Sequence, residues 1–298
     1  MKAAPLSAVI LAYNEEVNIR KTLESLSGWV GEIWLVDSGS SDATTRIARG
    51  YTENVVDHPY TDHASQWTWA LAQLPLAHEW VLLVDSDFVF TPHLRDLITV
   101  ALDRVDPAVA GFYVMHRYVF RGKPICFGGT KKWWLRVVRR GATAIDRSEM
   151  VDFRVIAAGR TERLSGLVLE DNLKEYDIDF WIDKHQKFSS RMAIEEVLRR
   201  EGALNWAISP NLFGNPDERI VWLKQKWYGL PLYVRPLLYF LYRFFLRLGF
   251  LDGVQGAIFH FLQGFWFRLI VDIKMAKIYE SLRSGQSTLE DMRRDFLR

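Results

Sequence analysis

The chain has 298 residues, of which 49% are hydrophobic and 25% are charged, and its net charge is +2. These values are ordinary for a globular protein and exclude a disordered chain or a strongly basic nucleic-acid-binding protein. Cys126 is the only cysteine, which excludes an intrachain disulfide and favours a reducing compartment. Residues 1–7 lack the pattern of a signal peptide, so we expect a cytoplasmic protein.

Short apolar runs alternate with helical spacings near the amino terminus. Residues 7–12 and 33–36 each predict a strand followed by a polar turn and a helix. Residues 54–56 predict a third strand, which precedes a helix at 63–74, and the fully apolar residues 80–84 predict a fourth. This alternation predicts an α/β fold with a mainly parallel sheet and helices on both faces.

The pattern changes after residue 110. Residues 111–169 predict added strands and a loop region, residues 179–200 predict an amphipathic helix, and residues 205–219 are typical of a linker. The expected division is an amino-terminal α/β domain of two halves, followed by a helical region: residues 1–204 (halves 1–110 and 111–204) and 205–298.

Polar clusters follow three of the predicted strands: Tyr13-Asn14-Glu15-Glu16, Asp37-Ser38-Gly39-Ser40-Ser41-Asp42 and Asp85-Ser86-Asp87. Parallel strands end at one edge of a sheet, and ligands bind there. Tyr13 suits stacking and Asn14 suits a helix N-cap. Asp37 can accept a hydrogen bond from a nucleobase while Asp42 caps the next helix, although a simple strand-to-helix turn also explains this cluster.

Asp85 and Asp87 leave a buried strand two residues apart. Carboxylates so placed can share a hard cation with diphosphate oxygens, so we expect Mg²⁺ or Mn²⁺ here. The alternative is a helix cap or a solvated turn.

These three clusters, in this order and spacing, resemble those of family 2 glycosyltransferases over about residues 6–170. The resemblance implies a GT-A fold, a nucleoside-diphosphate sugar as donor and inversion at the anomeric carbon. It implies that residues 1–204 are the catalytic domain, with a nucleotide-sugar half at 1–110 and an acceptor half at 111–204. It implies that Asp87 ligates the metal and that Asp85 contacts ribose or metal. The residues expected to bind the nucleotide sugar are Tyr13, Asn14, Glu15, Asp37, Ser38, Gln66, Asp85 and Ser86.

Residues 135–141 and the later Leu164-x-Gly166 are similar to the lipopolysaccharide-core type within that family. Relatives of this type carry a His-Glu pair between these segments, whereas this chain reads Glu149-Met150-Val151-Asp152-Phe153. An inverting transfer needs a carboxylate as general base. Asp152 is the first candidate, Glu149 the second, and the pair Glu170-Asp171 a further alternative.

A second departure lies at Gln66-Trp67-Thr68-Trp69-Ala70-Leu71, where relatives often read Gln-Arg-Asn-x-Ala-Leu. Positive charge for the diphosphate is then expected from a basic run that otherwise belongs on a solvated surface: Lys131, Lys132, Arg136 and Arg139.

Residues 219–278 hold nine Lys or Arg against two Asp, together with fifteen aromatic residues. Arg235, Arg243 and Arg247 share one arc of about 120° on a helix predicted over residues 232–251. We expect amphipathic helices that lie in the headgroup plane on the cytoplasmic face of a membrane, and hence a glycan or polyprenyl-linked acceptor. A dimer interface or packed core is the alternative, and His260 is interpreted as structural.

Two other functions compete with glycosyl transfer. A sugar nucleotidyltransferase would carry a Gly-rich phosphate loop where this chain has Tyr13-Asn14-Glu15-Glu16. A non-catalytic membrane-associated assembly partner would explain the altered base motif.

Overall fold

The computed structural model describes residues 3–149 and 153–297 and divides into two compact units. Unit 1 comprises Met1–Pro124, Lys131–Ile145 and Arg154–Lys174, and unit 2 comprises Ile125–Thr130, Asp146–Phe153 and Glu175–Arg298. The long helix after residue 177 lies in unit 2, together with the carboxyl-terminal helices. The division at residue 204 into separate domains stays a prediction.

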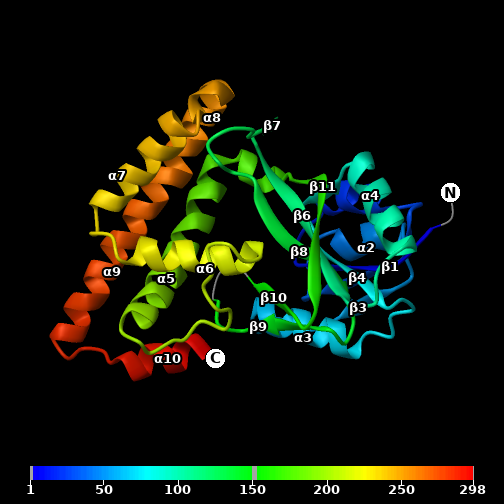
Figure 1. Cartoon of the computed structure of the whole chain (residues 1–298), viewed down its shortest axis with the longest axis horizontal. Coiled ribbons are helices and arrows are strands. Elements are labelled where there is room, and N and C mark those ends of the chain that lie inside the picture. Colours follow the sequence, from blue (N-terminus) through cyan, green and yellow to red (C-terminus); the bar gives the residue numbers. More distant parts are fainter. Residues whose placement is uncertain (1–2, 150–152, 298) are drawn as a thin grey trace. The chain divides into compact units, whose positions relative to one another are not determined.

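The main sheet of unit 1 has the order β3-β2-β1-β4-β8-β6-β11-β5, with β7 paired to β6. Figure 1 shows its neighbouring strands β8, β6 and β11 side by side. Its strands are β1 Ala4–Ala12, β2 Val30–Asp37, β3 Val55–Asp57, β4 Trp80–Asp85, β5 Phe88–Phe90, β6 Val109–Phe120, β7 Lys123–Pro124, β8 Lys132–Arg139 and β11 Arg160–Glu170. The first four strands along the chain confirm the predicted ones, and β3, β2, β1 and β4 pair in parallel. Strands β9 (Thr143–Asp146) and β10 (Arg154–Ala157) form a small second sheet.

Helices cover both faces of this sheet. Side chains that alternate along the central strands are therefore buried on opposite sides. Ala8 and Ile10 of β1 share a core with apolar residues of α1 (Ile19–Leu26) and α4 (Pro92–Asp103). Val9, between them, is also fully buried, and α3 (His63–Gln73) packs against β1. A strand buried on both faces needs the continuous apolar runs that the sequence shows.

The predicted N-cap at Asn14 is wrong. Helix α1 begins at Ile19, with Asn18 at its N-cap position. Asn14 adopts a left-handed backbone with φ of 52°, a conformation that Asn tolerates better than most residues. The predicted N-cap at Asp42 is also wrong by one residue, because Ala43 holds the N-cap position of α2 (Thr44–Ala48). Asp42 lies just before it and accepts a hydrogen bond from the Thr44 amide.

Unit 2 is helical. Its core lies between α5 (Ile178–Arg200) and α9 (Phe267–Arg283) and includes Ala193, Val197 and Met275. The remaining elements are η1 Leu173–Tyr176, which crosses from unit 1, α6 Pro216–Tyr228, α7 Val234–Leu241, η2 Tyr242–Leu246, η3 Gly249–Asp252, α8 Gly253–Phe259, η4 His260–Trp266 and α10 Leu289–Leu297.

The single helix predicted over residues 232–251 is instead broken. It consists of α7, one π-helical turn at η2 and a 3-10 turn at η3. Among the described residues, Gly249–Arg283 is the one helical stretch that is long and apolar enough to cross a membrane by length and composition, and 39% of its most apolar window is buried within the protein. Length and composition alone are weak evidence for a span.

Candidate active site

The ends of β1, β2 and β4 lie side by side at one edge of the unit 1 sheet. Ala12 pairs with Asp37, and the preceding Leu11 pairs with Asp85. The parallel register therefore brings together the polar loops that follow these three strands. This confirms that the clusters predicted from the sequence share one edge.

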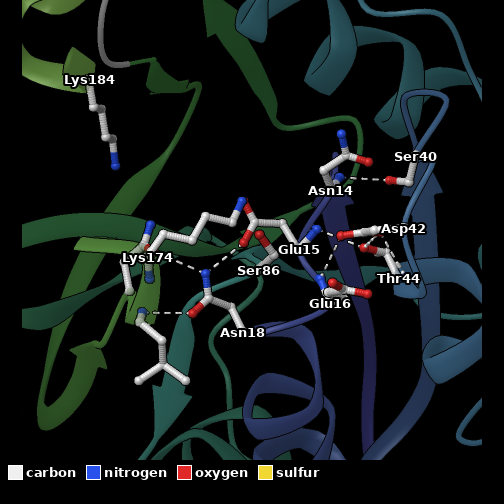
Figure 2. A network of polar contacts seen from close by, with 12 residues as sticks. Asn14, Glu15, Glu16, Asn18, Ser40, Asp42, Thr44, Ser86, Lys174 and Lys184 are labelled. Atoms are coloured by element: carbon white, nitrogen blue, oxygen red, sulfur yellow. Dashed lines mark hydrogen bonds and ion pairs between the residues drawn. The ribbon is translucent and has the colours of Figure 1, made fainter. Parts of the chain in front are cut away.

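The loops after β1 and β2 are joined by hydrogen bonds, which Figure 2 shows. The Asn14 amide donates to Ser40 Oγ at 2.8 Å, and the Asn14 side-chain oxygen accepts from the Ser41 amide at 2.8 Å. The Glu15 amide donates to Thr44 Oγ1 at 2.7 Å. Asn14 therefore joins the two loops, which explains why it does not cap a helix.

Asp42 and Glu16 continue this connection. The Glu16 amide donates to Asp42 Oδ2 at 3.1 Å, and Glu16 Oε2 accepts from the Ala43 amide at 2.9 Å. Burial opposes ionisation of Asp42, but hydrogen bonds from the Thr44 hydroxyl and from the amides of Thr44 and Glu16 lower the pKa of Asp42 overall. Asp42 is thus held as an anion that fixes the start of α2.

Asp37 is 1% exposed, and its carboxylate is engaged within its own turn. It accepts from the amides of Gly39 and Ser40 at 3.0 and 2.7 Å and from the Ser40 hydroxyl at 2.5 Å. Gly39 has a φ of 87°, which glycine adopts without strain. These contacts indicate that Asp37 shapes the loop, whereas the sequence suggested direct contact with a nucleobase.

Gln66 also supports the loop that follows β2. It is 1% exposed, and its amide nitrogen donates to Ser38 Oγ at 3.1 Å and to the His58 carbonyl oxygen at 3.2 Å. The Nδ1 atom of His58 donates to the Gln66 side-chain oxygen at 2.7 Å, and the His58 ring stacks on Trp69. Tyr13, in contrast, is 59% exposed and has a free surface for stacking.

Asp85 ends β4 beside a buried arginine. Arg136 of β8 is 1% exposed and donates to Asp85 Oδ2 at 2.9 Å. Its guanidinium lies between the rings of Phe88 and Trp134, at 5.1 and 4.7 Å from their centres. The rings hold a desolvated cation against the carboxylate, so the orientation of Asp85 is fixed.

The other oxygen of Asp85, Oδ1, is buried and accepts no hydrogen bond from the residues that the structure describes. His63 Nε2 approaches it to 4.0 Å. A buried carboxylate oxygen without a donor is expensive unless a ligand satisfies it. This oxygen fits the divalent cation predicted here.

Within the described ranges, no group of three or more His, Cys, Asp and Glu side chains is placed to hold a metal ion. Mg²⁺ in nucleotide-dependent enzymes is commonly held by one or two carboxylates together with substrate phosphates and water. Asp85 and Asp87 are the carboxylates that would hold it, so the donor set fits a cation bound with its nucleotide and does not fit a cage built from protein ligands alone.

Helix α1 holds the loop that carries these acids. Thr22 Oγ1 donates to the carbonyl oxygen of Ser86 at 2.7 Å, and Ser25 Oγ accepts from the amide of Phe90 at 3.2 Å. Ser86 itself is 8% exposed. The placement indicates that Ser86 contributes through its backbone to the shape of the loop.

The end of β11 adds a further wall to the site. Glu170 pairs with Phe88, and the Asp171 amide donates to the Asp87 carbonyl oxygen at 3.0 Å. The pair Glu170-Asp171, the third choice for the base, therefore lies directly beside the acids of the predicted metal site. Lys21 of α1 binds Asp171 at 2.6 Å.

A polar network centred on Asn18 connects this segment to Glu15 (Figure 2). Asn18 donates to Glu15 Oε2 at 2.7 Å and to Asn172 at 3.0 Å, and it accepts from the Leu173 amide at 2.8 Å. Lys174 binds Glu15 Oε1 at 2.7 Å. Sequence reasoning missed Asn18, Lys21 and Lys174, because the contacts join positions about 150 residues apart and no local motif marks them.

The predicted basic run divides between the two ends of β8. Arg136 lies at the site, whereas Arg139 pairs with Trp80 at the amino end of β4 and binds Glu79 at 2.6 Å. Arg139 is therefore at the wrong edge for the diphosphate, because β8 runs antiparallel to β4. Lys132 lies over the rings of Tyr118 and Trp134.

His116 of β6 lies between Phe88 and Trp134, with ring centres at 4.8 and 5.5 Å. Burial, with added repulsion from Arg136 and Lys132, lowers the pKa of His116 well below its usual value. The neutral ring fills the space behind the Arg136 guanidinium without adding a second buried charge.

Of the two acids chosen first as base, the structure describes only Glu149. Asp152 lies outside the described residues. Glu149 belongs to unit 2, where its side chain is 2% exposed and binds Lys224 at 2.8 Å. A carboxylate so buried and paired is a poor proton acceptor for a substrate hydroxyl.

Comparison with known proteins identifies relatives of this chain. The sequence model described as glycosyl transferase family 2 matches residues 7–150. The lipopolysaccharide core biosynthesis glycosyltransferase LpsC of Rhizobium meliloti (strain 1021) is 30% identical over 204 residues, which are 65% of this chain and 72% of that protein. An uncharacterized glycosyltransferase of Rickettsia felis (strain ATCC VR-1525 / URRWXCal2) is 30% identical over 31% of this chain and 32% of its own length.

Among solved structures, glucosyl-3-phosphoglycerate synthase from Mycobacterium tuberculosis, in complex with Mg²⁺ and uridine diphosphate, is 25% identical. The similarity covers 38% of this chain and 43% of that chain. Its TM-score of 0.31 is too low to support an argument about the site. The family match and the similarity to LpsC, together with the α/β sheet and its acidic edge, lead to one conclusion: the chain belongs to glycosyltransferase family 2.

Proposed function

We propose that the chain is a metal-dependent, inverting glycosyltransferase of the hexosyltransferase type that acts in cell-surface polysaccharide synthesis. Its donor would be a nucleoside-diphosphate sugar and its acceptor a glycan or a lipid-linked saccharide. The observation that carries this proposal is the convergence of Asp37, Asp85 and the loop of Asp87 at one sheet edge, where a buried oxygen of Asp85 has no donor among the residues described. The name of LpsC supports the class of acceptor.

Donor binding would use the two connected loops. Tyr13 would stack on the base, and Ser38 would meet the nucleoside from a turn whose shape is set by Asp37 and supported by Gln66. Lys21 and Lys174 bring positive charge to the same edge. A bound Mg²⁺ or Mn²⁺ would stabilise the negative charge of the departing diphosphate.

Glu15 would bind the donor and, at the same time, hold the segment that follows β11. Both of its carboxylate oxygens are engaged, one by Asn18 and one by Lys174. A nucleoside hydroxyl donating to Glu15 would share these oxygens, because a carboxylate has about four lone-pair sites. Donor binding and the position of residues 171–174 would then be coupled.

The general base takes a proton from the acceptor hydroxyl as that oxygen attacks the anomeric carbon and the bond to the diphosphate breaks. Asp152 stays our first assignment. The burial of Glu149 under Lys224 and the position of Glu170 beside Asp87 move Glu170 to second place.

The base assignment can be decided by three conservative variants: Asp152→Asn, Glu170→Gln and Glu149→Gln. Loss of the base lowers kcat by about 10²-fold or more while the affinity for the donor is retained. We expect this of Asp152→Asn. If only Glu170→Gln behaves so, the base lies on β11, and unchanged kcat in all three variants would contradict a carboxylate base among them.

The function is tested by incubating the purified chain with UDP-, GDP- and dTDP-sugars in the presence of Mn²⁺, Mg²⁺ or a chelator. We expect release of a nucleoside diphosphate from one donor class, and we expect the chelator to abolish it. Release of diphosphate from a nucleoside triphosphate would instead favour a nucleotidyltransferase. Absence of binding to every donor would favour an assembly partner, and the anomeric configuration of the product, measured by NMR, tests inversion.

A further inference from the structure

The apolar hairpin, residues 233–262, exposes an unusual share of large apolar side chains. Leu246 is 76% exposed and Val254 is 71% exposed. Exposed apolar side chains come from both helical arms and from the turn between them: Tyr233, Val234, Leu237, Leu238, Leu241, Tyr242, Phe245, Leu246, Leu248, Phe250, Leu251, Val254, Ile258 and Phe261. Patches of this size mark surfaces that meet something other than water.

The charged groups of the hairpin point inward. Arg235 is fully buried and binds Asp272, with 2.9 Å between Nε and Oδ1, and it also binds Glu196. Arg243 is 5% exposed and donates to the Gly128 carbonyl oxygen at 3.1 Å. The first two arginines of the predicted arc therefore face the protein and not the headgroups, whereas Arg247 is exposed.

The polar groups at the turn of the hairpin also make hydrogen bonds with other residues of the protein. The Asp252 side chain is 6% exposed and accepts from the amides of Cys126 and Phe127, both at 2.9 Å. The Gly128 amide donates to the Arg247 carbonyl oxygen at 2.9 Å. Backbone groups that enter an apolar medium need such internal partners, because that medium offers none.

Arg247 is consequently the only charged residue in the exposed class between residues 233 and 262, a stretch that the structure describes throughout. Charges inside and apolar side chains outside reverse the order of a water-soluble helix pair. This order is unfavourable in water and favourable in hydrocarbon.

We infer that the apolar hairpin inserts into one leaflet of a phospholipid bilayer. A second copy of the chain would cover one side of the hairpin. The exposed groups instead lie on both arms and on the turn, since Phe245 and Leu246 lie on one arm, Phe250 on the turn and Val254 on the other arm. Residues 126–128 cover one side of the turn, and a bilayer would cover the sides that the protein leaves open.

The depth of one leaflet suits the hairpin. Residues 253–261 rise about 14 Å at 1.5 Å per residue, close to half of a hydrocarbon core of about 30 Å. The following helix α9 returns to the protein core through Phe267 and Val271. The apolar stretch is therefore available to lipid only over its first part, which favours insertion over a complete span.

A collar of aromatic and cationic side chains lies toward the base of the hairpin. The Arg268 guanidinium lies over Trp227 and Tyr239, at 5.9 and 5.8 Å from the ring centres, and Lys226 lies over Trp222 at 5.4 Å. Trp and Tyr favour the headgroup region, and Lys and Arg bind anionic lipid there. Arg247 does not belong to this collar, because it lies directly before the turn, with its guanidinium beside Gly129. Its long side chain would extend along the hairpin toward a lipid phosphate.

This inference deepens the proposed function, on which its meaning for catalysis rests: a chain anchored in a leaflet would take an acceptor that is itself embedded in that leaflet, on the cytoplasmic side. Membrane binding is nevertheless measurable without donor, metal or acceptor. Failure of the hairpin to bind lipid would leave glycosyl transfer intact, and failure of transfer would leave lipid binding intact.

The first experiment is flotation of the full-length chain with unilamellar vesicles of two compositions. One contains phosphatidylethanolamine and phosphatidylcholine, and the other contains the same two lipids with added anionic phosphatidylglycerol. We expect the wild type to float with both and more completely with the anionic vesicles. The variant Leu246→Glu/Val254→Glu is expected to lose at least tenfold in partitioning. The matched control is Val100→Glu/Phe213→Glu, which changes two side chains that are 60% and 94% exposed outside the hairpin and should float as the wild type does.

The second experiment does not depend on a charged variant. In a Cys126→Ser background, cysteine replaces Leu246 or Phe213 and carries an environment-sensitive dye. Vesicles should shift the emission to the blue at position 246 and leave position 213 unchanged.

Equal flotation of the two double variants, or an unchanged dye at position 246, would overturn the inference. So would a blue shift that follows protein concentration without vesicles, with a matching dimer in sedimentation velocity, because that result identifies a second copy as the occupant.

Discussion

The carboxyl edge of the unit 1 sheet and the apolar hairpin of unit 2 both contain buried arginine. The surface around the first is polar, whereas the surface around the second is apolar. Arg136 is buried so that Asp85 keeps a cation beside it at a polar edge. Arg235 and Arg243 are buried on acids and carbonyl groups of the protein, and apolar side chains remain outside. The first arrangement suits a charged, soluble ligand, and the second suits an apolar medium.

The comparison shows that a buried charge has meaning only through its partner. At the sheet edge, Asp85 Oδ1 has no donor within the described part of the chain, so the network is open to a ligand. In unit 2, Asp272 also accepts from the Tyr233 amide at 2.8 Å, so its network is closed on the protein. An open network predicts large effects on activity, whereas a closed one predicts effects on stability.

The largest effect is expected from Asp87. Asp87→Asn should reduce transfer by about 10³-fold, because the departing diphosphate loses stabilisation. Initial rates at saturating donor measure this, and thermal unfolding should be nearly unchanged. Asp103→Asn, an exposed acid on α4, is the matched control. Wild-type rates in Asp87→Asn would remove the metal assignment.

Removal of Arg136 should have the next largest effect. Arg136→Met leaves Asp85 without its cation, so kcat/KM should fall by about 100-fold, which is about 2.7 kcal/mol. Arg139→Met, on the same strand, removes the exposed pair with Glu79 and should change kcat/KM less than twofold. Equal losses in the two variants would show that β8 has only a structural role.

A pH dependence of stability is expected in unit 2. Burial lowers the pKa of His185 to about 4, against about 6.5 when the chain is unfolded. The unfolded state therefore binds the proton first as the pH falls, and about 2 kcal/mol of stability is lost between pH 8 and pH 5. Urea unfolding at both pH values measures the loss.

The matching variant is His185→Phe, which keeps the stack on Trp181 but removes the titrating group. It should reduce the difference in unfolding free energy between the two pH values by most of that amount. A difference as large as in the wild type would assign the pH dependence to other groups, among them His116 in unit 1.

The smallest effect is expected from Asn18. Asn18→Ala removes three hydrogen bonds at a residue that is 1% exposed, and we expect a loss of about 1–2 kcal/mol in unfolding free energy. It should also weaken donor binding, since Glu15 loses one of its two partners. Asn54→Ala is the control, because Asn54 makes a single long side-chain hydrogen bond to Ile33. Unchanged stability and donor binding would show that the network does not hold residues 171–174.

The sequence by itself determined the α/β fold and the edge at which the acids meet. Apolar runs in β1, β2 and β4 can be buried only in a sheet covered on both faces, and parallel register then brings the residues after each run together. Asp37 and Asp85 could therefore be placed at one edge without coordinates.

Tertiary structure alone decided what each of these residues contacts. Asn14 is of a residue type that commonly caps helices, but its hydrogen bonds are made with Ser40 and Ser41 of another loop. Glu15 meets Lys174 from a segment 159 residues away. No local pattern encodes such partners.

The hairpin shows the same division. Helical periodicity gave the shared arc of its arginines, and this arc is the same whether it faces lipid headgroups or the protein. Only the positions of Asp272, Glu196 and the Gly128 carbonyl group decide that Arg235 and Arg243 face inward. Periodicity fixes which side chains lie together, and only distant partners fix whether their common face is turned in or out.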